Sequence, residues 1–330
     1  MLVITGGGGF IGSVLGAALN EAGRSDLVIV DHFGSGDKWR NIAKREFRDI
    51  VPVEGLLPWL DRYGAEVKAV FHLGANSSTF ADDADEIIAT NLNASIALWR
   101  WCAAKAKPLI YASSAATYGD GSAGFDDAGG IDAMKRLRPL NLYGWSKHAF
   151  DLWAMREAAA GQAPPRWVGL KFFNVFGPNE YHKGEMMSLV VKNYRQVAAG
   201  QTIRLFKSHR PDYADGEQRR DFVYVKDCVA VMLWAWRRGA GANINGIYNL
   251  GTGEARSFLD LINATGAACG VAPNIEFIDI PPAIRSSYQY FTEAKMSRLR
   301  QAGYNAPFTP LEDAVRDCVT QYLAQDDPYL

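Results

Sequence analysis

The sequence contains few cysteines, and they form no pattern that holds a metal or a disulfide framework. Its four cysteines, Cys102, Cys228, Cys269 and Cys318, stand far apart, with no C-x-x-C pair and no cluster of histidines. Zinc sites and disulfide scaffolds need closely spaced residues of these kinds. We therefore expect buried, inert thiols, no metal ion, and a reducing, cytoplasmic setting.

Long apolar runs and an excess of charge of either sign are also absent. No apolar run approaches the roughly 20 residues that a membrane span needs, although 48% of the 330 residues are hydrophobic. A formal net charge of −1 offers no basic face to nucleic acid or to an anionic membrane. The printed chain opens on MLVITGGGGFIG without a basic segment, so we expect no secretory signal.

The first half of the chain alternates short apolar runs with longer amphipathic segments. Continuous apolar strands separated by helices indicate a parallel sheet that is covered on both faces. The sequence therefore predicts an α/β fold with a doubly wound parallel sheet. The runs cover residues 2–4, 27–30, 67–73, 108–112 and 167–173.

Three glycines, Gly6, Gly9 and Gly12, follow the first predicted strand and open a predicted helix. Glycines at this spacing allow a tight turn, close approach of the backbone to a pyrophosphate and close packing of helix on strand. The helix then offers its free N–H groups to the phosphates. The context of strand, turn and helix predicts a dinucleotide site.

Two residues bear on which dinucleotide binds. Asp31 ends the next strand, where a carboxylate holds the ribose hydroxyls of NAD. Lys38, seven residues further on, is able to meet the 2′-phosphate of NADP, or else it is a solvated loop lysine. The residues by themselves leave the choice between NAD and NADP open.

A tyrosine and a lysine, Tyr143 and Lys147, are four residues apart and share one face of a predicted helix. The pKa of a free phenol lies near 10, so Tyr143 needs help to act as a base. We expect the ammonium of Lys147 and the positive nicotinamide to lower the pKa of Tyr143. Ser114, at the end of a predicted strand, would hydrogen-bond the same substrate oxygen.

The motifs TGGGGFIG, SSAATYG, YGWSK, FFNVFGP, RDFVYVKD and NLGTG follow one another along the chain. In this combination the chain resembles the extended short-chain dehydrogenase/reductase superfamily of nucleotide-sugar epimerases and dehydratases. The segments HKG and YQYFTEA further resemble the family of ADP-L-glycero-D-manno-heptose 6-epimerases. The resemblance implies a Rossmann domain over residues 1–175, with 220–252 returning to it, and a mainly substrate-binding domain over 176–330.

The resemblance also implies an activity and a cofactor. Such an isomerase uses tightly held NADP to remove hydride from carbon six of ADP-D-glycero-D-manno-heptose and returns it to the other face, for lipopolysaccharide heptose supply. We expect a nucleotide-sugar substrate, no nucleic-acid or membrane partner, and a homo-oligomer, by resemblance a homopentamer. The alternative is another nucleotide-sugar epimerase, such as a UDP-hexose 4-epimerase with NAD. Ala115 and Ala116 disfavour a dehydratase, and the retained Tyr143 and Lys147 disfavour a non-catalytic sensor.

The resemblance assigns roles residue by residue. Tyr143 and Lys183 would be the two acid/bases, with Ser114 and Lys147 assisting Tyr143. Cofactor contacts would be Gly6, Gly9, Phe10, Ile11, Gly12, Asp31, His32, Lys38, Leu73, Gly74, Ala75, Asn76, Ser77, Asn91, Lys147, Val175 and Lys183. Substrate contacts would be Asn174, Glu185, Lys192, Phe206, Lys207, Ser208, His209, Arg220 and Tyr288.

Several of these residues have structural alternatives. Asn91 could pin a helix, Tyr288 could be a core aromatic, and Lys183 could be a solvated lysine after the apolar run 167–176. Glu185 departs from the family pattern, which has a small hydroxyl residue there, and its carboxylate would repel a diphosphate. We expect His182, which has no ligand partner nearby in sequence, to be structural.

Overall fold

The computed structural model describes residues 1–238, 244–285 and 288–330. Its main feature is a seven-stranded sheet in the order β10-β6-β5-β4-β1-β2-β3, and all six strand pairs are parallel. The sheet confirms the predicted doubly wound fold. Its strands are β1 (Leu2–Thr5), β2 (Leu27–Val30), β3 (Asp49–Val51), β4 (Ala69–His72), β5 (Leu109–Ser114), β6 (Trp167–Phe172) and β10 (Gly246–Leu250).

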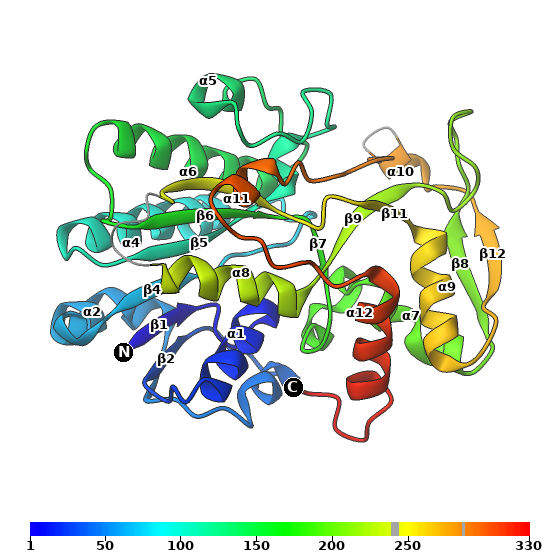
Figure 1. Cartoon of the computed structure of the whole chain (residues 1–330), viewed down its shortest axis with the longest axis horizontal. Helices are drawn as coiled ribbons and strands as arrows, with labels where there is room; N and C mark the ends of the chain where they lie inside the picture. Colours follow the sequence, from blue (N-terminus) through cyan, green and yellow to red (C-terminus); the bar gives the residue numbers. More distant parts are fainter. Residues whose placement is uncertain (239–243, 286–287) are drawn as a thin grey trace.

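Helices cover both faces of this sheet (Figure 1). Alternate side chains of β1 separate into two cores: Leu2 and Ile4 pack toward one face, and Val3 packs toward the other. Continuous apolar strands are explained by this arrangement, since both faces of each strand are buried. The first face carries α1 (Phe10–Glu21) and α8 (Val225–Arg237), and the second carries α2 (Leu56–Tyr63), α4 (Ala94–Ala104) and α6 (Leu142–Ala159).

A smaller lobe adds two further sheets (Figure 1). One has the order β11-β9-β7, and the other pairs β12 with β8 in parallel. The predicted division into a Rossmann domain, residues 1–175 with 220–252, and a substrate-binding domain, residues 176–330, stays a prediction. Within the segment 220–252, β10 joins the large sheet, whereas β9 joins a sheet of the smaller lobe. The elements are β7 (Asn174–Phe176), β8 (Thr202–Phe206), β9 (Arg219–Tyr224), β11 (Ala255–Ser257), β12 (Asn274–Ile278), α7 (Leu189–Ala198), α9 (Phe258–Cys269) and α12 (Leu311–Cys318).

Short helices connect these elements, and three of them border the site described below. They are the 3-10 helices η1 (Asp37–Ile42), η5 (Ala115–Tyr118) and η6 (Tyr181–Met186). The others include α3 (Ala84–Ile87), α5 (Gly130–Met134), α10 (Pro282–Arg285) and α11 (Ser297–Gln301).

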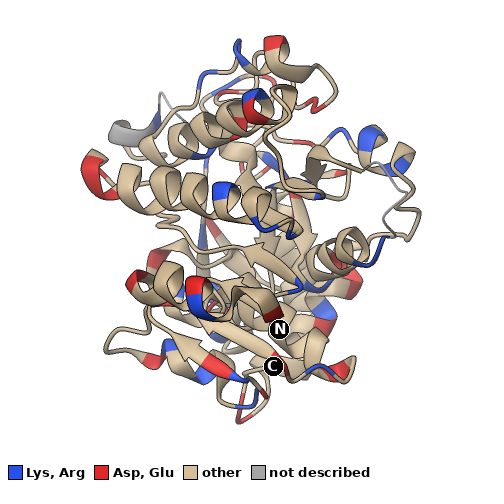
Figure 2. Ribbon diagram, turned by 90° about the vertical axis from the view of Figure 1, so that its left-hand side faces the viewer, with Lys and Arg blue, Asp and Glu red and all other residues tan. Residues whose placement is uncertain are grey.

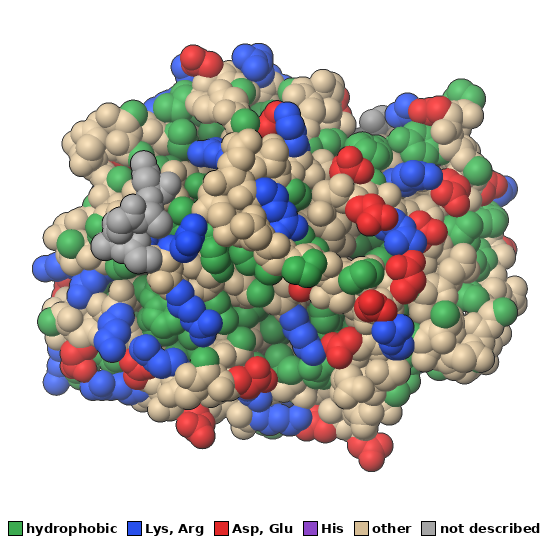
Figure 3. Space-filling view, in the orientation of Figure 1, with side chains coloured by type: hydrophobic (Ala, Val, Ile, Leu, Met, Phe, Trp, Pro, Cys, Tyr) green, Lys and Arg blue, Asp and Glu red, His purple; other side chains and the backbone are tan. Residues whose placement is uncertain are grey.

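Residues of both charges are interspersed along the ribbon in Figure 2, and their side chains are interspersed over the face shown in Figure 3. This distribution agrees with the formal net charge of −1. Among the helices of the described residues, none is both long and apolar enough to cross a membrane.

Candidate active site

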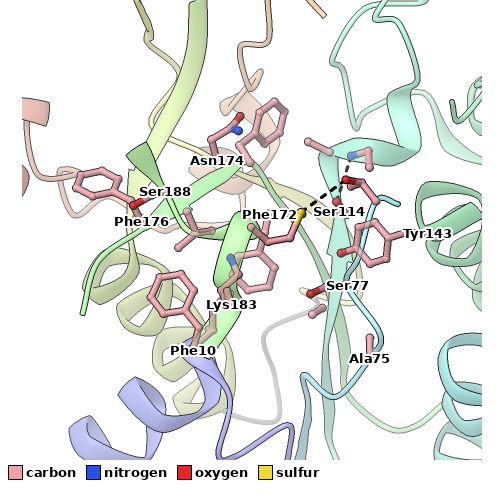
Figure 4. Close-up of a pocket in the computed structure, with 18 of the residues that line it drawn as sticks. Phe10, Ala75, Ser77, Ser114, Tyr143, Phe172, Asn174, Phe176, Lys183 and Ser188 are labelled. Atoms are coloured by element: carbon pink, nitrogen blue, oxygen red, sulfur yellow. Dashed lines mark hydrogen bonds between the residues drawn. The ribbon is translucent and has the colours of Figure 1, made fainter. Parts of the chain in front are cut away.

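A cavity of about 870 Å³ opens where β1, β4, β5 and β6 end, and the smaller lobe closes its other side (Figure 4). In open α/β sheets, ligands bind outside the carboxyl ends of the strands, where the strand order reverses. The order β4-β1-β2 places such a reversal between β1 and β4. The cavity therefore lies where the fold places a nucleotide.

The turn from β1 into α1 forms one end of the cavity. Gly6 has a φ of +68°, and a Cβ there would lie 2.7 Å from the backbone nitrogen of Gly74. A Cβ on Gly12 would lie 2.1 Å from the carbonyl oxygen of Gly6. Both positions therefore need glycine, which lets the turn pack closely against neighbouring backbone. The first turn of α1 then faces the cavity, as the binding of a pyrophosphate requires.

Asp31 and Lys38 lie together in the cavity wall beside this turn. The backbone N–H of Gly8 donates to Asp31 Oδ2 at 2.8 Å. Lys38 Nζ donates to Asp31 Oδ1 at 2.6 Å and to the carbonyl oxygen of His32 at 2.8 Å. Lys38 therefore faces the end of the cavity that would hold the adenosine, and its charge compensates that of Asp31.

Tyr143 and Lys147 enter the cavity from the first two turns of α6. The helix begins where it does because Asn141 caps it, accepting a hydrogen bond from the N–H of Gly144 at 2.8 Å. Lys147 Nζ donates to the carbonyl oxygen of Ala112 at 3.0 Å. Burial lowers the pKa of Lys147 to about 8, and the charge of Asp151 partly opposes this effect.

The protonation of Tyr143 differs from the sequence expectation. Burial raises the pKa of Tyr143, Ser114 lowers it in part, and the charge of Asp151 adds to the rise. The expectation of a lowered pKa considered Lys147 and a nicotinamide but not the burial of the ring. Among the protein's own groups burial dominates, so the positive nicotinamide is needed to favour the phenolate.

Lys183 lines the opposite wall of the cavity from Tyr143 (Figure 4). Its Nζ lies 5.2 Å from the ring centroid of Phe10 and 3.9 Å from Glu180 Oε2. Glu180 is fully buried and accepts a hydrogen bond from the N–H of Ser188 at 2.7 Å. Lys183 is thus held against the cavity by a fixed segment, in contrast to a freely solvated lysine.

His182 also lines the cavity, although the sequence placed it among structural residues. Asn41 Nδ2 lies 3.2 Å from its Nδ1. Burial and the charges of Lys38 and Lys183 lower the pKa of His182 to about 4, so the imidazole is neutral at neutral pH. Its place beside Lys183 in the HKG segment was the only sequence signal for this position.

Many predicted site residues do line the cavity. They are Gly6, Gly9, Phe10, Ile11, Gly12, Asp31, Lys38, Leu73, Gly74, Ala75, Ser77, Ser114, Tyr143, Lys147, Asn174, Val175, Lys183 and Tyr288. Other apolar and polar residues complete the wall, among them Phe172, Phe173, Met186, Met187, Phe222, Phe258, Leu261, Gln289 and Thr292. Phe172 and Phe173 belong to the apolar run 167–173 that the sequence predicted as a strand, whereas Phe222 and Phe258 come from β9 and α9.

Other predicted residues lie outside the cavity wall, and their roles stay predictions. Glu185 and Lys192 form an ion pair with each other. The Arg220 guanidinium stacks on the Tyr288 ring at 5.5 Å and hydrogen-bonds the carbonyl oxygen of Gln289. The full set is His32, Asn76, Asn91, Glu185, Lys192, Phe206, Lys207, Ser208, His209 and Arg220.

Two residues of this set have clear structural contacts. Asn91 is fully buried, and its side chain accepts from the N–H of Asn76 at 2.8 Å and donates to the carbonyl oxygen of Asn76 at 2.9 Å. Asn91 therefore fixes the loop that forms the cavity wall at Ala75 and Ser77. His32 Nε2 lies 2.9 Å from Glu54 Oε1 at the surface.

Comparison with known proteins decides the family. The model of the NAD dependent epimerase/dehydratase family matches residues 2–251. The chain belongs to this family. A relative from Nitratidesulfovibrio vulgaris (strain DP4), named ADP-L-glycero-D-manno-heptose-6-epimerase, is 48% identical over 338 residues, which cover 100% of both chains. A relative of the same name from Fusobacterium nucleatum subsp. nucleatum is 44% identical, again over 100% of both chains.

Solved structures of this epimerase/dehydratase family have the same architecture. The crystal structure of Helicobacter pylori ADP-L-glycero-D-manno-heptose-6-epimerase superposes with a TM-score of 0.79 at 27% identity, covering 97% of this chain and 95% of that one. The structure of MoeE5 in complex with UDP-glucose and NAD gives a TM-score of 0.74 at 25% identity, covering 96% and 97%. These matches confirm the family resemblance that the sequence motifs predicted.

Proposed function

We propose that this protein converts ADP-D-glycero-D-manno-heptose to ADP-L-glycero-D-manno-heptose, and so supplies heptose for lipopolysaccharide. The observation that carries the proposal is the placement of Tyr143 and Lys183 on opposite walls of one cavity (Figure 4). An epimerase that oxidises and reduces one carbon meets the carbinol oxygen in two orientations, so it needs an acid/base on each side. The full-length relative at 48% identity bears the name of this activity.

The residues of the cavity fit a dinucleotide cofactor. The glycine turn holds the first turn of α1 against the cavity, because a Cβ at Gly6 would meet the backbone of Gly74 and a Cβ at Gly12 would meet the carbonyl oxygen of Gly6. When bound, a nicotinamide dinucleotide accepts hydride from the carbinol carbon and returns it. Lys147 would hold the nicotinamide half of the cofactor and place an ammonium beside the Tyr143 phenol.

The chain's own groups perform the proton transfers. We assign Tyr143 the carbinol proton of one epimer and Lys183 that of the other, each acting as base toward one epimer and as acid toward the other. Ser114 shares the hydrogen bond to the oxygen on the Tyr143 side. The apolar wall, which includes Phe172, Met186 and Met187, excludes water from the ketone.

Product analysis tests the proposed function. The purified protein is incubated with ADP-D-glycero-D-manno-heptose, and the configuration at carbon six is read by NMR. UDP-glucose, in a parallel reaction, tests the alternative of a 4-epimerase. Conversion of the heptose alone supports the proposal, whereas conversion of UDP-glucose to UDP-galactose with an unchanged heptose contradicts it.

An isotope experiment tests the proposed chemistry. Because the cofactor stores the hydride and gives it back, a reaction run in heavy water is expected to place no deuterium on carbon six. Mass spectrometry and NMR of the product measure this. Incorporation at carbon six would indicate a carbanion and would exclude the oxidation–reduction route.

We infer that the cofactor is NADP, since Lys38 lies in the wall beside the adenosine end and neutralises Asp31. Lys38→Ala is expected to weaken NADP binding about tenfold or more, the cost of losing a charged hydrogen bond. NAD binding should change little, because the freed Asp31 is able to accept ribose hydroxyls. Calorimetry with both dinucleotides measures the two dissociation constants.

A second lysine of the same segment provides the control for this prediction. Lys44 forms an ion pair with Asp327 at 3.0 Å and does not line the cavity. Lys44→Ala is therefore expected to leave the preference for NADP unchanged. Equal dissociation constants for Lys38→Ala and the wild type, or NAD as the dinucleotide released from the purified protein, would overturn the NADP assignment.

A further inference from the structure

A buried ion pair lies directly behind the wall that carries Tyr143 and Lys147. Lys171 Nζ, on β6, lies 2.6 Å from Asp151 Oδ2, on α6, and their side chains are 2% and 0% exposed. Taking two charges out of water costs more free energy than their attraction returns unless further hydrogen bonds satisfy them. The proton transfers proposed above do not use this pair.

Further hydrogen bonds tie the pair to the catalytic wall. Asp151 Oδ1 accepts from the hydroxyl of Tyr111 at 3.0 Å, and Asp151 Oδ2 accepts from the hydroxyl of Ser113 at 2.6 Å. Both donors belong to β5, the strand that ends at Ser114. The carboxylate therefore joins the helix of Tyr143 and Lys147 to the strand of Ser114.

Lys171 extends the network to the segment after β5. Its Nζ donates to Thr117 Oγ1 at 2.6 Å, and Thr117 Oγ1 in turn donates to the carbonyl oxygen of Ser114 at 2.8 Å. Through Thr117, the lysine holds the backbone of the residue whose hydroxyl accompanies Tyr143. The two charges thus connect α6, β5, β6 and η5.

The spacing along α6 brings the carboxylate close to both catalytic groups. Asp151 follows Lys147 by four residues and Tyr143 by eight, so the three lie on one face within about two turns. The charge of Asp151 raises the pKa of Tyr143 and of Lys147. The Lys171 ammonium has the opposite sign, so the pair balances the charge behind the wall.

Burial disfavours the charged forms of other titratable groups on the elements that pack around the pair. Burial and the charge of Lys147 lower the pKa of His72, on β4, to about 3. Burial first, and then Lys171, lowers the pKa of His148, on α6, where Arg138 also acts. Burial raises the pKa of Tyr111 well above its usual value. Behind the wall, the Asp151 carboxylate adds to the effect of burial in raising the pKa of Tyr143, and the Lys171 ammonium lies 2.6 Å from that carboxylate.

We propose that Asp151 and Lys171 are positioning residues whose balanced charges set the pH at which Tyr143 exchanges its proton. Neither touches the cavity, so both act through Tyr143, Lys147 and Ser114. The inference rests on the proposed role of Tyr143 as an acid/base. A structural role alone predicts the same effect for the loss of either charge, whereas a charge balance predicts effects of opposite sign.

The direction of each effect follows from the charge that remains. Lys171→Met leaves the Asp151 carboxylate uncompensated, which disfavours the phenolate and moves the ionisation of Tyr143 to higher pH. Asp151→Asn keeps an oxygen that accepts from Ser113 and leaves the Lys171 ammonium uncompensated, which moves the ionisation to lower pH. Each shift is expected to be about one pH unit, as for charges about 10 Å apart at an effective dielectric constant of about 20. The double variant, which lacks both charges, should return close to the wild-type pH.

The experiment follows Tyr143 itself in the protein with its cofactor bound. Tyrosine is labelled with carbon-13 at Cζ, the Tyr143 resonance is assigned from its absence in Tyr143→Phe, and its chemical shift is titrated against pH. The pH profile of epimerisation is measured alongside. Opposite shifts for Lys171→Met and Asp151→Asn support the inference, and shifts in one direction, or none, overturn it.

Two further variants keep the test decisive. Lys171→Arg retains the charge and should titrate like the wild type. If Lys171→Met melts before it is titrated, Lys171→Gln, which is able to donate to Thr117, replaces it with the same expected direction. Because the titration needs no substrate, a protein that fails to epimerise ADP-heptose yet shows opposite shifts contradicts the proposed function and leaves this inference standing.

Discussion

Replacing Lys183 by methionine is expected to slow epimerisation by about 10²–10⁴-fold, the usual cost of losing a general acid/base. Methionine keeps the length of the side chain but cannot carry a proton. Lys183 lies on the wall opposite Tyr143, so Tyr143 cannot reach the carbinol oxygen of the second epimer in its place. Product formation, followed by NMR with each epimer as substrate, measures the loss.

The first half-reaction separates this role from a general loss of structure. Lys183→Met should still oxidise the epimer that Tyr143 serves, visible as reduced nicotinamide in a single turnover, and fail to oxidise the other. Lys183→Arg retains the charge near Phe10 but not the base, and it should behave like Lys183→Met. Lys44→Met is the matched control, since Lys44 pairs with Asp327 at 3.0 Å and does not line the cavity. Full activity of Lys183→Met would show that Lys183 lines the cavity without transferring a proton.

Local patterns in the sequence predicted the large sheet and one side of the site. The continuous apolar strands follow from burial on both faces, so Leu2, Val3 and Ile4 are all needed to fill the two cores. The pairing of Tyr143 with Lys147 follows from helical periodicity alone. Gly6 and Gly12 were predictable because the turn that they form is local: Gly6 has a φ of +68°, and a Cβ on Gly12 would lie 2.1 Å from the carbonyl oxygen of Gly6.

The other side of the site depends on contacts between distant segments, which periodicity does not encode. Phe258, Gln289 and Thr292 reach the cavity from elements that follow the catalytic tyrosine by more than a hundred residues. Arg220 was expected to contact the substrate, which stays a prediction, and its guanidinium donates to the carbonyl oxygens of Arg219 and Gln289 and lies over the Tyr288 ring. The sequence identified its charge but could not reveal which groups would satisfy it.

Local charge patterns also left the interpretation of single residues open. The carboxylate of Glu185 would repel a diphosphate, and in the structure Glu185 forms an ion pair with Lys192 outside the cavity wall. The burial of Tyr143 shows the same limit, since the desolvation that raises its pKa depends on the walls around it. Both features arise from tertiary packing.

Tyr143→Phe is expected to slow epimerisation by about 10²–10⁴-fold as well, but with the opposite preference between the epimers. The substitution removes the hydroxyl and keeps the ring, so α6 and its cap at Asn141 should remain. Because Lys183 is intact, the variant should still oxidise the epimer that Lys183→Met cannot. Single-turnover formation of reduced nicotinamide from each epimer measures this preference.

A control at a second buried tyrosine tests whether Tyr143→Phe slows epimerisation because a proton transfer is lost. Tyr118 is buried near the site, and its hydroxyl donates to Asn249 Oδ1 at 2.7 Å. Tyr118→Phe also loses a buried hydroxyl, and the unpaired Asn249 lowers the free energy of unfolding by about 1–3 kcal/mol. The variant should still oxidise each of the two epimers as the wild type does. If two acid/bases act from opposite walls, Tyr143→Phe should fail to oxidise one epimer and Lys183→Met should fail to oxidise the other. If both variants lose the same half-reaction, both groups act on the same epimer. If one variant loses both half-reactions and the other loses neither, a single acid/base serves both epimers. Either result would make the two-sided mechanism wrong.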